Sequence, residues 1–344
     1  MLQVVKIINK IPSQIRNDML SWYDDHARVL PWRSRPFEKP DPYHVWMSEV
    51  MLQQTTVQAV IKYFEKFIDI WPTVYDLANA PQEDVMCEWA GLGYYSRARN
   101  LHKCAKMIVD EFGGQFPNDI KQLKSLPGIG DYTSAAISSI AFDTPSVVMD
   151  GNIERVVSRL YRIETPLPDS KPIIREFCAP LFVGDNTDRP SCFAQSLMDL
   201  GATICTPKSP KCMLCPISDY CAGYRAGDAD IYPIKRKKKK IPEKHAVAYI
   251  YIHQGQIGIE TREEKGMLGG MVGFPTSEWI DIEDALNKPN DGVFIRHVFT
   301  HFALTLYPQI IHEKTDNMVV LSDIDKIGLP TLFKKVWNMV RSQL

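Results

Sequence analysis

Four cysteines stand close together in the chain with the spacing C-x6-C-x2-C-x5-C, at Cys205, Cys212, Cys215 and Cys221. Dense thiolates in a sequence that shows no secretory signal favour a metal site over a disulfide framework. Zinc ribbons present two separated C-x2-C pairs, whereas this sequence has one pair flanked by wider gaps. One compact loop with four thiolates fits a cubane [4Fe–4S] cluster better. Zinc, or four unrelated buried cysteines, are the alternatives to this prediction.

A second motif lies in residues 123–141, which read LKSLPGIGDYTSAAISSIA. The end of an apolar helix meets Gly128 and Gly130, and a second helix opens directly after them. These glycines allow a tight turn and a close approach of the backbone to a partner. Amides at the start of the second helix favour an anion. The pattern predicts a helix-hairpin-helix that holds a DNA phosphate without reading base sequence; an ordinary helical hairpin is the alternative.

The elements that must position these motifs show two kinds of sequence pattern, one helical and one strand-like. Residues up to about 230 show helical periodicity interrupted by Pro and Gly, and one helix is expected to open at Asp41–Pro42 with Asp41 as its N-cap. After the run KRKKKK the sequence alternates and is rich in β-branched residues. We therefore expect a helical domain over 1–234, a basic linker over 235–242 and a small α+β domain over 243–344.

Charge and composition exclude some classes of function. The net charge is −1, so any contact with nucleic acid must come from local patches. No apolar run reaches the length of a membrane span, and the N-terminal residues lack a secretory pattern. The expected location is a reducing cytoplasm, at the nucleoid if the source is bacterial, and the protein is not expected to be secreted.

The helix-hairpin-helix, an aspartate shortly after it and the cysteine loop together resemble the endonuclease III superfamily of DNA glycosylases. Finer motifs resemble its adenine-specific branch, the MutY family, over nearly the whole chain: LPWR at 30–33, SEVMLQQTTV at 48–57, GLGYYSRARNLH at 91–102 and VMDGNIERV at 148–156. The resemblance implies an all-helical glycosylase core with a [4Fe–4S] loop, followed by a small Nudix-like α+β domain.

Two carboxylates carry the expected chemistry. Helical spacing places Glu49 on one face with Val45 and Trp46, and an apolar pocket would raise its pKa so that it holds a proton near neutral pH. The resemblance implies that Glu49 protonates the leaving adenine and that Asp150 faces the developing sugar cation. Asn152 would orient the water or the substrate. From sequence alone, Asp150-Gly-Asn reads equally as a helix cap.

Tyr132 separates two kinds of glycosylase. In lyase-competent members of the superfamily the matching position is a lysine, which attacks the sugar and forms a Schiff base. A phenol cannot form that imine, so the resemblance implies base removal without efficient strand cleavage. Tyr132 could equally be a packing aromatic.

The resemblance also assigns binding residues. Trp32, Arg33 and Gln195 would surround the adenine, and Gln54 and Tyr94 would fill the gap beside the orphan base after base flipping. Core packing is the alternative for Tyr94. In the C-terminal domain, Phe299, Thr300 and His301 match a lesion-sensing F-S-H loop, with threonine in place of serine. That domain lacks the clustered glutamates of Nudix hydrolases, so binding without hydrolysis is expected.

The function implied is that of a monomeric enzyme which removes adenine opposite 8-oxoguanine or guanine from double-stranded DNA. Two alternatives remain at this point: a pyrimidine-lesion glycosylase with lyase activity, and a non-catalytic iron–sulfur protein that binds DNA or senses redox state. Tyr132 and the additional domain argue against the first. Glu49 and Asp150 argue against the second.

Overall fold

A computed structural model describes residues 2–35, 38–184, 188–236, 241–281 and 293–344. The chain divides into two compact units. The first unit comprises residues 1–75 and 104–237, and the second comprises residues 76–103 and 238–344. No local sequence signal indicates that residues 76–103 group with the C-terminal part of the chain, and the boundaries at 234 and 243 stay a prediction.

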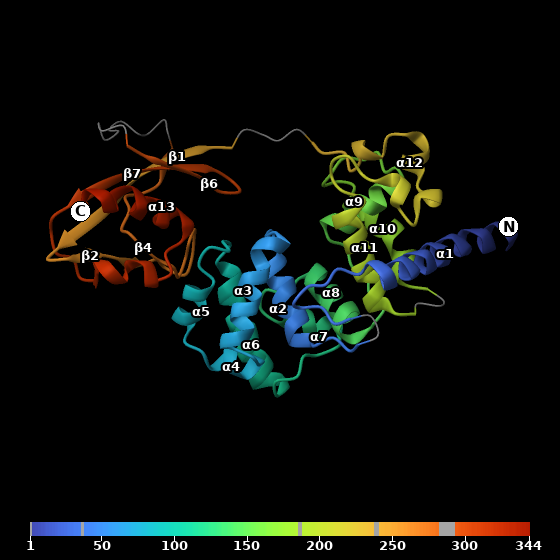
Figure 1. The fold of residues 1–344 in the computed structure, drawn as a ribbon, viewed down its shortest axis with the longest axis horizontal. Helices are drawn as coiled ribbons and strands as arrows, with labels where there is room; N and C mark the ends of the chain where they lie inside the picture. Colours follow the sequence, from blue (N-terminus) through green and yellow to red (C-terminus); the bar gives the residue numbers. More distant parts are fainter. Residues whose placement is uncertain (1, 36–37, 185–187, 237–240, 282–292) are drawn as a thin grey trace. The chain divides into compact units, whose positions relative to one another are not determined.

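The first unit is helical. Its helices are α1 (Leu2–His26), α2 (Pro42–Leu52), α3 (Val57–Ile70), α7 (Ile120–Ser125), α8 (Asp131–Phe142), α9 (Gly151–Leu160), α10 (Lys171–Phe182), α11 (Pro190–Thr203) and α12 (Ala222–Ala226). Short 3₁₀ turns occur at Cys212–Leu214, Ser218–Tyr220 and Ala229–Ile231. Helix α11 packs against α1, α8 and α9, and α2 packs against α8 (Figure 1). Helices α1, α2 and α9 therefore pack around the pair formed by α8 and α11.

Local signals explain where two of these helices begin. The Asp41 side chain accepts a hydrogen bond from the Tyr43 amide at the start of α2, which confirms the predicted cap with Pro42 in the first turn. Asp150 caps α9 in the same way by accepting from the Ile153 amide. The cap reading of Asp150 is thus confirmed, and the cap also fixes the direction of this carboxylate.

Three helices lie wholly or partly in residues 76–103: α4 (Val74–Asn79), α5 (Gln82–Glu88) and the beginning of α6 (Ser96–Phe112). The rest of the second unit is a mixed sheet with strand order β6-β7-β1-β2-β8, and β5 also pairs with β1. Its strands are β1 (Glu243–His253), β2 (Gln256–Gly258), β5 (Ile280–Asp281), β6 (Ile295–Val298), β7 (Ala303–Ile311) and β8 (Met318–Val320). Strands β3 (Glu260–Thr261) and β4 (Val272–Gly273) form a separate pair.

The central pair, β1 and β7, is parallel, and the other pairs are antiparallel. Helix α13 (Thr331–Val340) buries Phe333 and Val336 in the same apolar core as Ile250 and Leu306. Gly255, with a φ of +75°, forms the turn of the hairpin between β1 and β2. The segment 295–311 is strand-like throughout its sequence but forms two strands, β6 and β7, joined by a turn.

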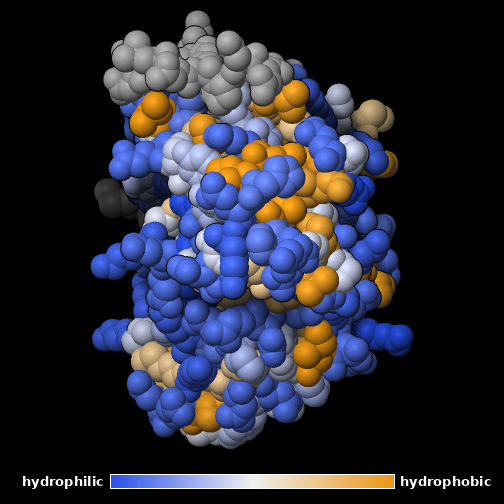
Figure 2. Space-filling view, turned by 90° about the vertical axis from the view of Figure 1, so that its left-hand side faces the viewer, coloured by the Kyte–Doolittle hydropathy of each residue, from blue (hydrophilic) through white to orange (hydrophobic). Residues whose placement is uncertain are grey.

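The face in Figure 2 is mostly hydrophilic, and hydrophobic residues gather in limited patches on it. Within the described part of the chain, no helix combines the length and the apolar character needed to cross a membrane.

Candidate active site and cysteine loop

The predicted catalytic and base-binding residues surround one cavity of about 690 Å³ in the first unit. Its wall comes from the segment before α2, from α2 itself, from the hairpin before α8, and from the starts of α8 and α9 with part of α11. The sequence-predicted residues in this wall are Trp32, Arg33, Glu49, Gln54, Gly128, Gly130, Tyr132, Asp150, Asn152 and Gln195. Trp32 and Gln195, which are 163 positions apart in the sequence, are thus brought to one site.

Glu49 is 6 % exposed and accepts a hydrogen bond of 2.6 Å at Oε2 from the Tyr132 hydroxyl. Burial raises the pKa of Glu49 to about 7, and the negative charge of Asp150 acts in the same direction. The Tyr132 hydroxyl and the positive charge of Arg33 act against the rise. Glu49 can therefore carry a proton near neutral pH, the property that a general acid requires.

Asp150 is held by two donors: the Ile153 amide at 2.7 Å and the Asn152 side-chain amide at 2.8 Å. Burial raises the pKa of Asp150, and these hydrogen bonds oppose the rise. Arg155 in turn donates to the Asn152 side-chain oxygen at 2.9 Å. Asn152 thus orients the Asp150 carboxylate, and Arg155 orients Asn152.

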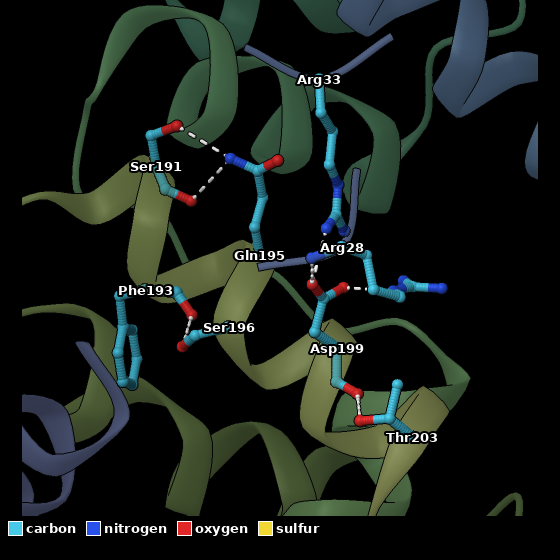
Figure 3. Close-up of polar contacts among 8 residues, drawn as sticks. All are labelled: Arg28, Arg33, Ser191, Phe193, Gln195, Ser196, Asp199 and Thr203. Atoms are coloured by element: carbon cyan, nitrogen blue, oxygen red, sulfur yellow. Dashed lines mark hydrogen bonds and ion pairs between the residues drawn. The ribbon is translucent and has the colours of Figure 1, made fainter. Parts of the chain in front are cut away.

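One wall of the cavity carries two arginines and an amide (Figure 3). Asp199, which is fully buried on α11, accepts from Arg28 and from Arg33. One turn earlier on α11, Gln195 donates through Nε2 to the carbonyl oxygen and the hydroxyl of Ser191. Because a carbonyl oxygen can only accept, this contact fixes the amide orientation and turns the Gln195 oxygen away from Ser191 (Figure 3).

The four predicted metal ligands, Cys205, Cys212, Cys215 and Cys221, line one small cavity beside Arg159. Arg159 is 1 % exposed and donates to the Cys205 sulfur at 3.3 Å. Burial raises the pKa of the Cys215 thiol, and a positive charge beside a buried thiol favours its thiolate form.

The described residues contain no set of three or more His, Cys, Asp or Glu side chains arranged to hold one metal ion. A cubane does not require such a set, because each of its irons takes a different thiolate. The loop also contacts the active site, because Arg155 donates to the Cys205 carbonyl at 2.7 Å. The loop and Asn152 are thereby joined through one side chain.

A second cavity, of about 430 Å³, lies in the second unit and is lined by the predicted residues Tyr94, Phe299, Thr300 and His301. The Tyr94 and Thr300 hydroxyls are 2.8 Å apart. Tyr94 has a backbone φ of +47°, a conformation that is uncommon for a residue other than glycine. Phe299 stacks on Trp279.

Sequence reasoning missed the residues that support these sites: Arg28, Arg155, Arg159 and Asp199. Each lies far in the sequence from at least one of its partners. Asp199 had one usable signal, because it stands alone as an acid among the apolar residues of SLMDLGA. A lone charge inside an apolar helix requires a buried partner.

Three protein-family models match the chain. One described as HhH-GPD superfamily base excision DNA repair protein covers residues 47–180. The iron–sulfur binding domain of endonuclease III covers residues 205–221, and a NUDIX domain covers residues 246–339. The chain is thus a helix-hairpin-helix DNA repair protein with an iron–sulfur loop and a C-terminal NUDIX-type domain, and the predicted fold class and iron–sulfur cofactor are confirmed.

The relatives define the branch of this superfamily. The chain is 35 % identical to the adenine DNA glycosylase of Buchnera aphidicola subsp. Schizaphis graminum, with 94 % of this chain and 97 % of the relative covered. It is 33 % identical to the human adenine DNA glycosylase, over 84 % of this chain and 65 % of that protein. The chain belongs to the adenine DNA glycosylase family.

Two solved structures share their fold with about 64 % and 63 % of the chain. A thermostable thymine-DNA glycosylase matches with a TM-score of 0.55 and 28 % identity, over 64 % of this chain and 99 % of that one. An endonuclease III in complex with DNA matches with a TM-score of 0.51 and 24 % identity, over 63 % and 97 %.

Proposed function

We propose that this protein hydrolyses the N-glycosidic bond of adenine opposite 8-oxoguanine or guanine in double-stranded DNA, and that it leaves the strand uncut. The main support for this proposal is the hydrogen bond between Glu49 and Tyr132 inside a cavity that is also lined by Asp150. A proton-bearing carboxyl and a second carboxylate in one buried site suit glycosidic cleavage.

The proposed reaction uses the chain's own residues. Glu49 gives its proton to a ring nitrogen of the flipped adenine, and the bond to the sugar breaks with its electron pair on the base. Asp150, oriented by Asn152, stabilises the sugar cation. Water then adds to the sugar, and its proton returns to Glu49. The Gln195 amide oxygen offers an acceptor suited to the 6-amino group of adenine.

Strand cleavage is not part of the proposal, because an amine nucleophile is needed for it. Among the described residues, the cavity wall contains Tyr132 but no lysine. The pyrimidine-lesion glycosylase/lyase is therefore the less favoured alternative. A purely binding, non-catalytic iron–sulfur protein would have no use for the raised pKa of Glu49.

The remaining roles belong to the same proposal. Gln54 and the hairpin glycines Gly128 and Gly130 contact DNA from the first unit. Tyr94 and the loop of Phe299, Thr300 and His301 read the base opposite adenine from the second. The chain acts as a monomer in a reducing cytoplasm, with no membrane partner.

One assay tests this function. The purified, iron-containing protein is incubated with duplexes that carry adenine opposite 8-oxoguanine, guanine or thymine, and the products are resolved with and without alkali. We expect base loss opposite 8-oxoguanine and guanine, with strand breaks only after alkali. Breaks without alkali and efficient borohydride trapping would favour the lyase alternative. Binding without base loss would favour the non-catalytic one.

A further inference from the structure

The cavity of the first unit is bounded on one side by the segment between α1 and α2, whose described residues, 27–35 and 38–41, form no α-helix or β-strand. Arg28 and Arg33 in this segment both face the cavity. A wall without regular structure needs side-chain contacts to hold it at a fixed distance from the reacting base.

Asp199 supplies such contacts from α11. Its Oδ1 accepts from Arg28 Nε at 2.7 Å, and its Oδ2 accepts from the Arg28 backbone amide at 2.9 Å and from Arg33 Nη1 at 2.7 Å. Asp199 is 0 % exposed, and the Arg33 side chain is 8 % exposed. One carboxylate therefore fixes a backbone amide and two guanidinium groups, as drawn in Figure 3.

Asp199 is absent from the lining of the cavity, although both of its arginines line it. It therefore lies behind the wall and acts through Arg28 and Arg33. Charge-assisted hydrogen bonds of this kind are short and directional, so the remaining N–H groups of the two arginines are held in defined directions.

The contact of Asp199 with the two arginines also affects the charge near Glu49. The groups that act on Glu49 are Tyr132 from α8, Asp150 at the start of α9 and Arg33 from the wall, and Arg33 favours the charged form of Glu49. Asp199 opposes the positive charge of Arg33 from α11. Without the Asp199 charge, Arg33 would face Glu49 with less compensation, and Glu49 would lose its proton more readily.

We propose that Asp199 is a positioning residue for base removal: its buried carboxylate holds Arg28 and Arg33 in the cavity wall and balances the charge of Arg33 beside Glu49. This inference rests on the proposed adenine glycosylase activity. Asp199 contacts neither the reacting atoms nor the wall surface, so its effect passes through the two arginines.

The test is the pH profile of single-turnover adenine removal from A:8-oxoguanine duplexes by the full chain. Asp199→Asn keeps the side-chain shape but removes the charge. The limb on which activity falls with rising pH should then move to lower pH. A displacement of about one pH unit lowers the rate on that limb about tenfold. Melting temperature and iron content show whether the variant is folded.

Two further variants complete the test. Asp199→Glu retains the charge on a longer side chain. The rate should fall because the arginines move, while the pH at which activity declines should stay as in the wild type. Asp24→Asn is the matched control, because Asp24 pairs with Arg189 outside the cavity, and it should leave both rate and limb unchanged.

The outcomes are separable. A wild-type protein that removes no adenine defeats the proposed function itself. If the wild type is active and Asp199→Asn shows the same rate and the same fall of activity with rising pH, the proposed role of Asp199 is overturned. If Asp199→Asn does not fold, Asp199→Glu decides: an unchanged rate overturns the positioning role, and a displaced limb overturns the charge-balance role.

Discussion

The burial of Glu49 beside a second carboxylate lowers the stability of the fold when Glu49 is charged, but the same burial lets Glu49 hold the proton that its function requires. It is buried beside a second carboxylate, Asp150, and its pKa lies at about 7. A carboxyl group that must be protonated to act gains from this burial, because the neutral form is the one that the dry cavity favours. Tyr132 donates to Glu49 and keeps the carboxyl oriented without supplying an amine.

The first prediction concerns proton transfer. Glu49→Gln should abolish adenine removal and leave duplex binding largely intact, because the amide keeps the size of the side chain but cannot give a proton. Loss of a general acid lowers rates by ~10²–10⁴-fold. Single-turnover rates and affinities for an A:8-oxoguanine duplex are measured, with Glu38→Gln, an exposed glutamate, as the control. Activity within a few-fold of wild type would contradict the assignment.

The second prediction concerns stability and pH. Glu49 has a pKa of about 7 in the fold, against an ordinary value of 4.5. Between these values the folded protein binds a proton that the unfolded chain has lost, so the stability contributed by Glu49 falls as pH rises from 4.5 through about 7. The cost at higher pH is up to ~3 kcal/mol.

Glu49→Gln removes this cost, because its amide is neutral at every pH. Its melting temperature should exceed that of the wild type at about pH 8, and the difference should shrink at about pH 5. A difference that does not change with pH would show that Glu49 is not protonated in the folded protein.

At the scale of elements, the start of α9 and the cysteine loop share one side chain. Arg155 donates to Asn152, to the Gly201 carbonyl at 2.6 Å and to the Cys205 carbonyl. The loop that carries the cluster therefore supports the residue that orients Asp150. Arg155 thus connects the cysteine loop to the cavity that holds Asp150, although the two are distant in the sequence.

The third prediction tests this connection. Arg155→Lys keeps the charge but cannot serve three acceptors in the geometry of a guanidinium group. We expect adenine removal to slow by about ten- to a hundredfold, the usual range for groups that orient ligands. Arg162→Lys is the control, because Arg162 pairs with Asp228 on a partly exposed surface. Equal rates for the two variants, at equal iron content, would refute the connection.

The elements also show what a sequence can reveal. The α2 cap at Asp41, the helix-hairpin-helix and the cysteine loop rest on local signals, since each depends on residues within about one or two turns of each other. Asp199 and Arg155 do not, because the partners of Asp199 lie up to 171 residues away. Arg155 acquires its contact with Gly201 only when α9 packs against α11, and Asp199 acquires its partners only when Arg28 and Arg33 lie against α11. The grouping of residues 76–103 with the C-terminal domain is non-local for the same reason.

At the scale of the whole molecule, the grouping of residues 76–103 with the C-terminal part of the chain affects how lesion recognition can be tested. Within the second unit, Cys87 donates to the Lys326 carbonyl at 3.3 Å, and Arg99 donates to the Gly269 carbonyl. Removal of residues 243–344 would therefore also strip these partners from residues 76–103. A truncated chain would mix loss of lesion reading with damage to that segment, so point variants in the full chain give the cleaner experiment.

The last prediction uses the hydroxyl pair of Tyr94 and Thr300, which joins positions 206 residues apart across the second cavity. If the pair holds Thr300 toward the orphan base, Tyr94→Phe keeps the wedge ring but should lower the preference for 8-oxoguanine over guanine. Thr300→Val should do the same. One such hydrogen bond is worth ~0.5–1.5 kcal/mol, which corresponds to a change of about two- to tenfold.

The double variant decides whether the two hydroxyls act together, because a shared contact can be lost only once. We expect Tyr94→Phe with Thr300→Val to lower the ratio of single-turnover rates on A:8-oxoguanine and A:guanine no further than either change alone. Thr300→Ser, which keeps the hydroxyl and removes only the methyl group, should retain the preference. Additive losses, or an unchanged ratio in both single variants, would show that the orphan base is read by other groups of the second unit.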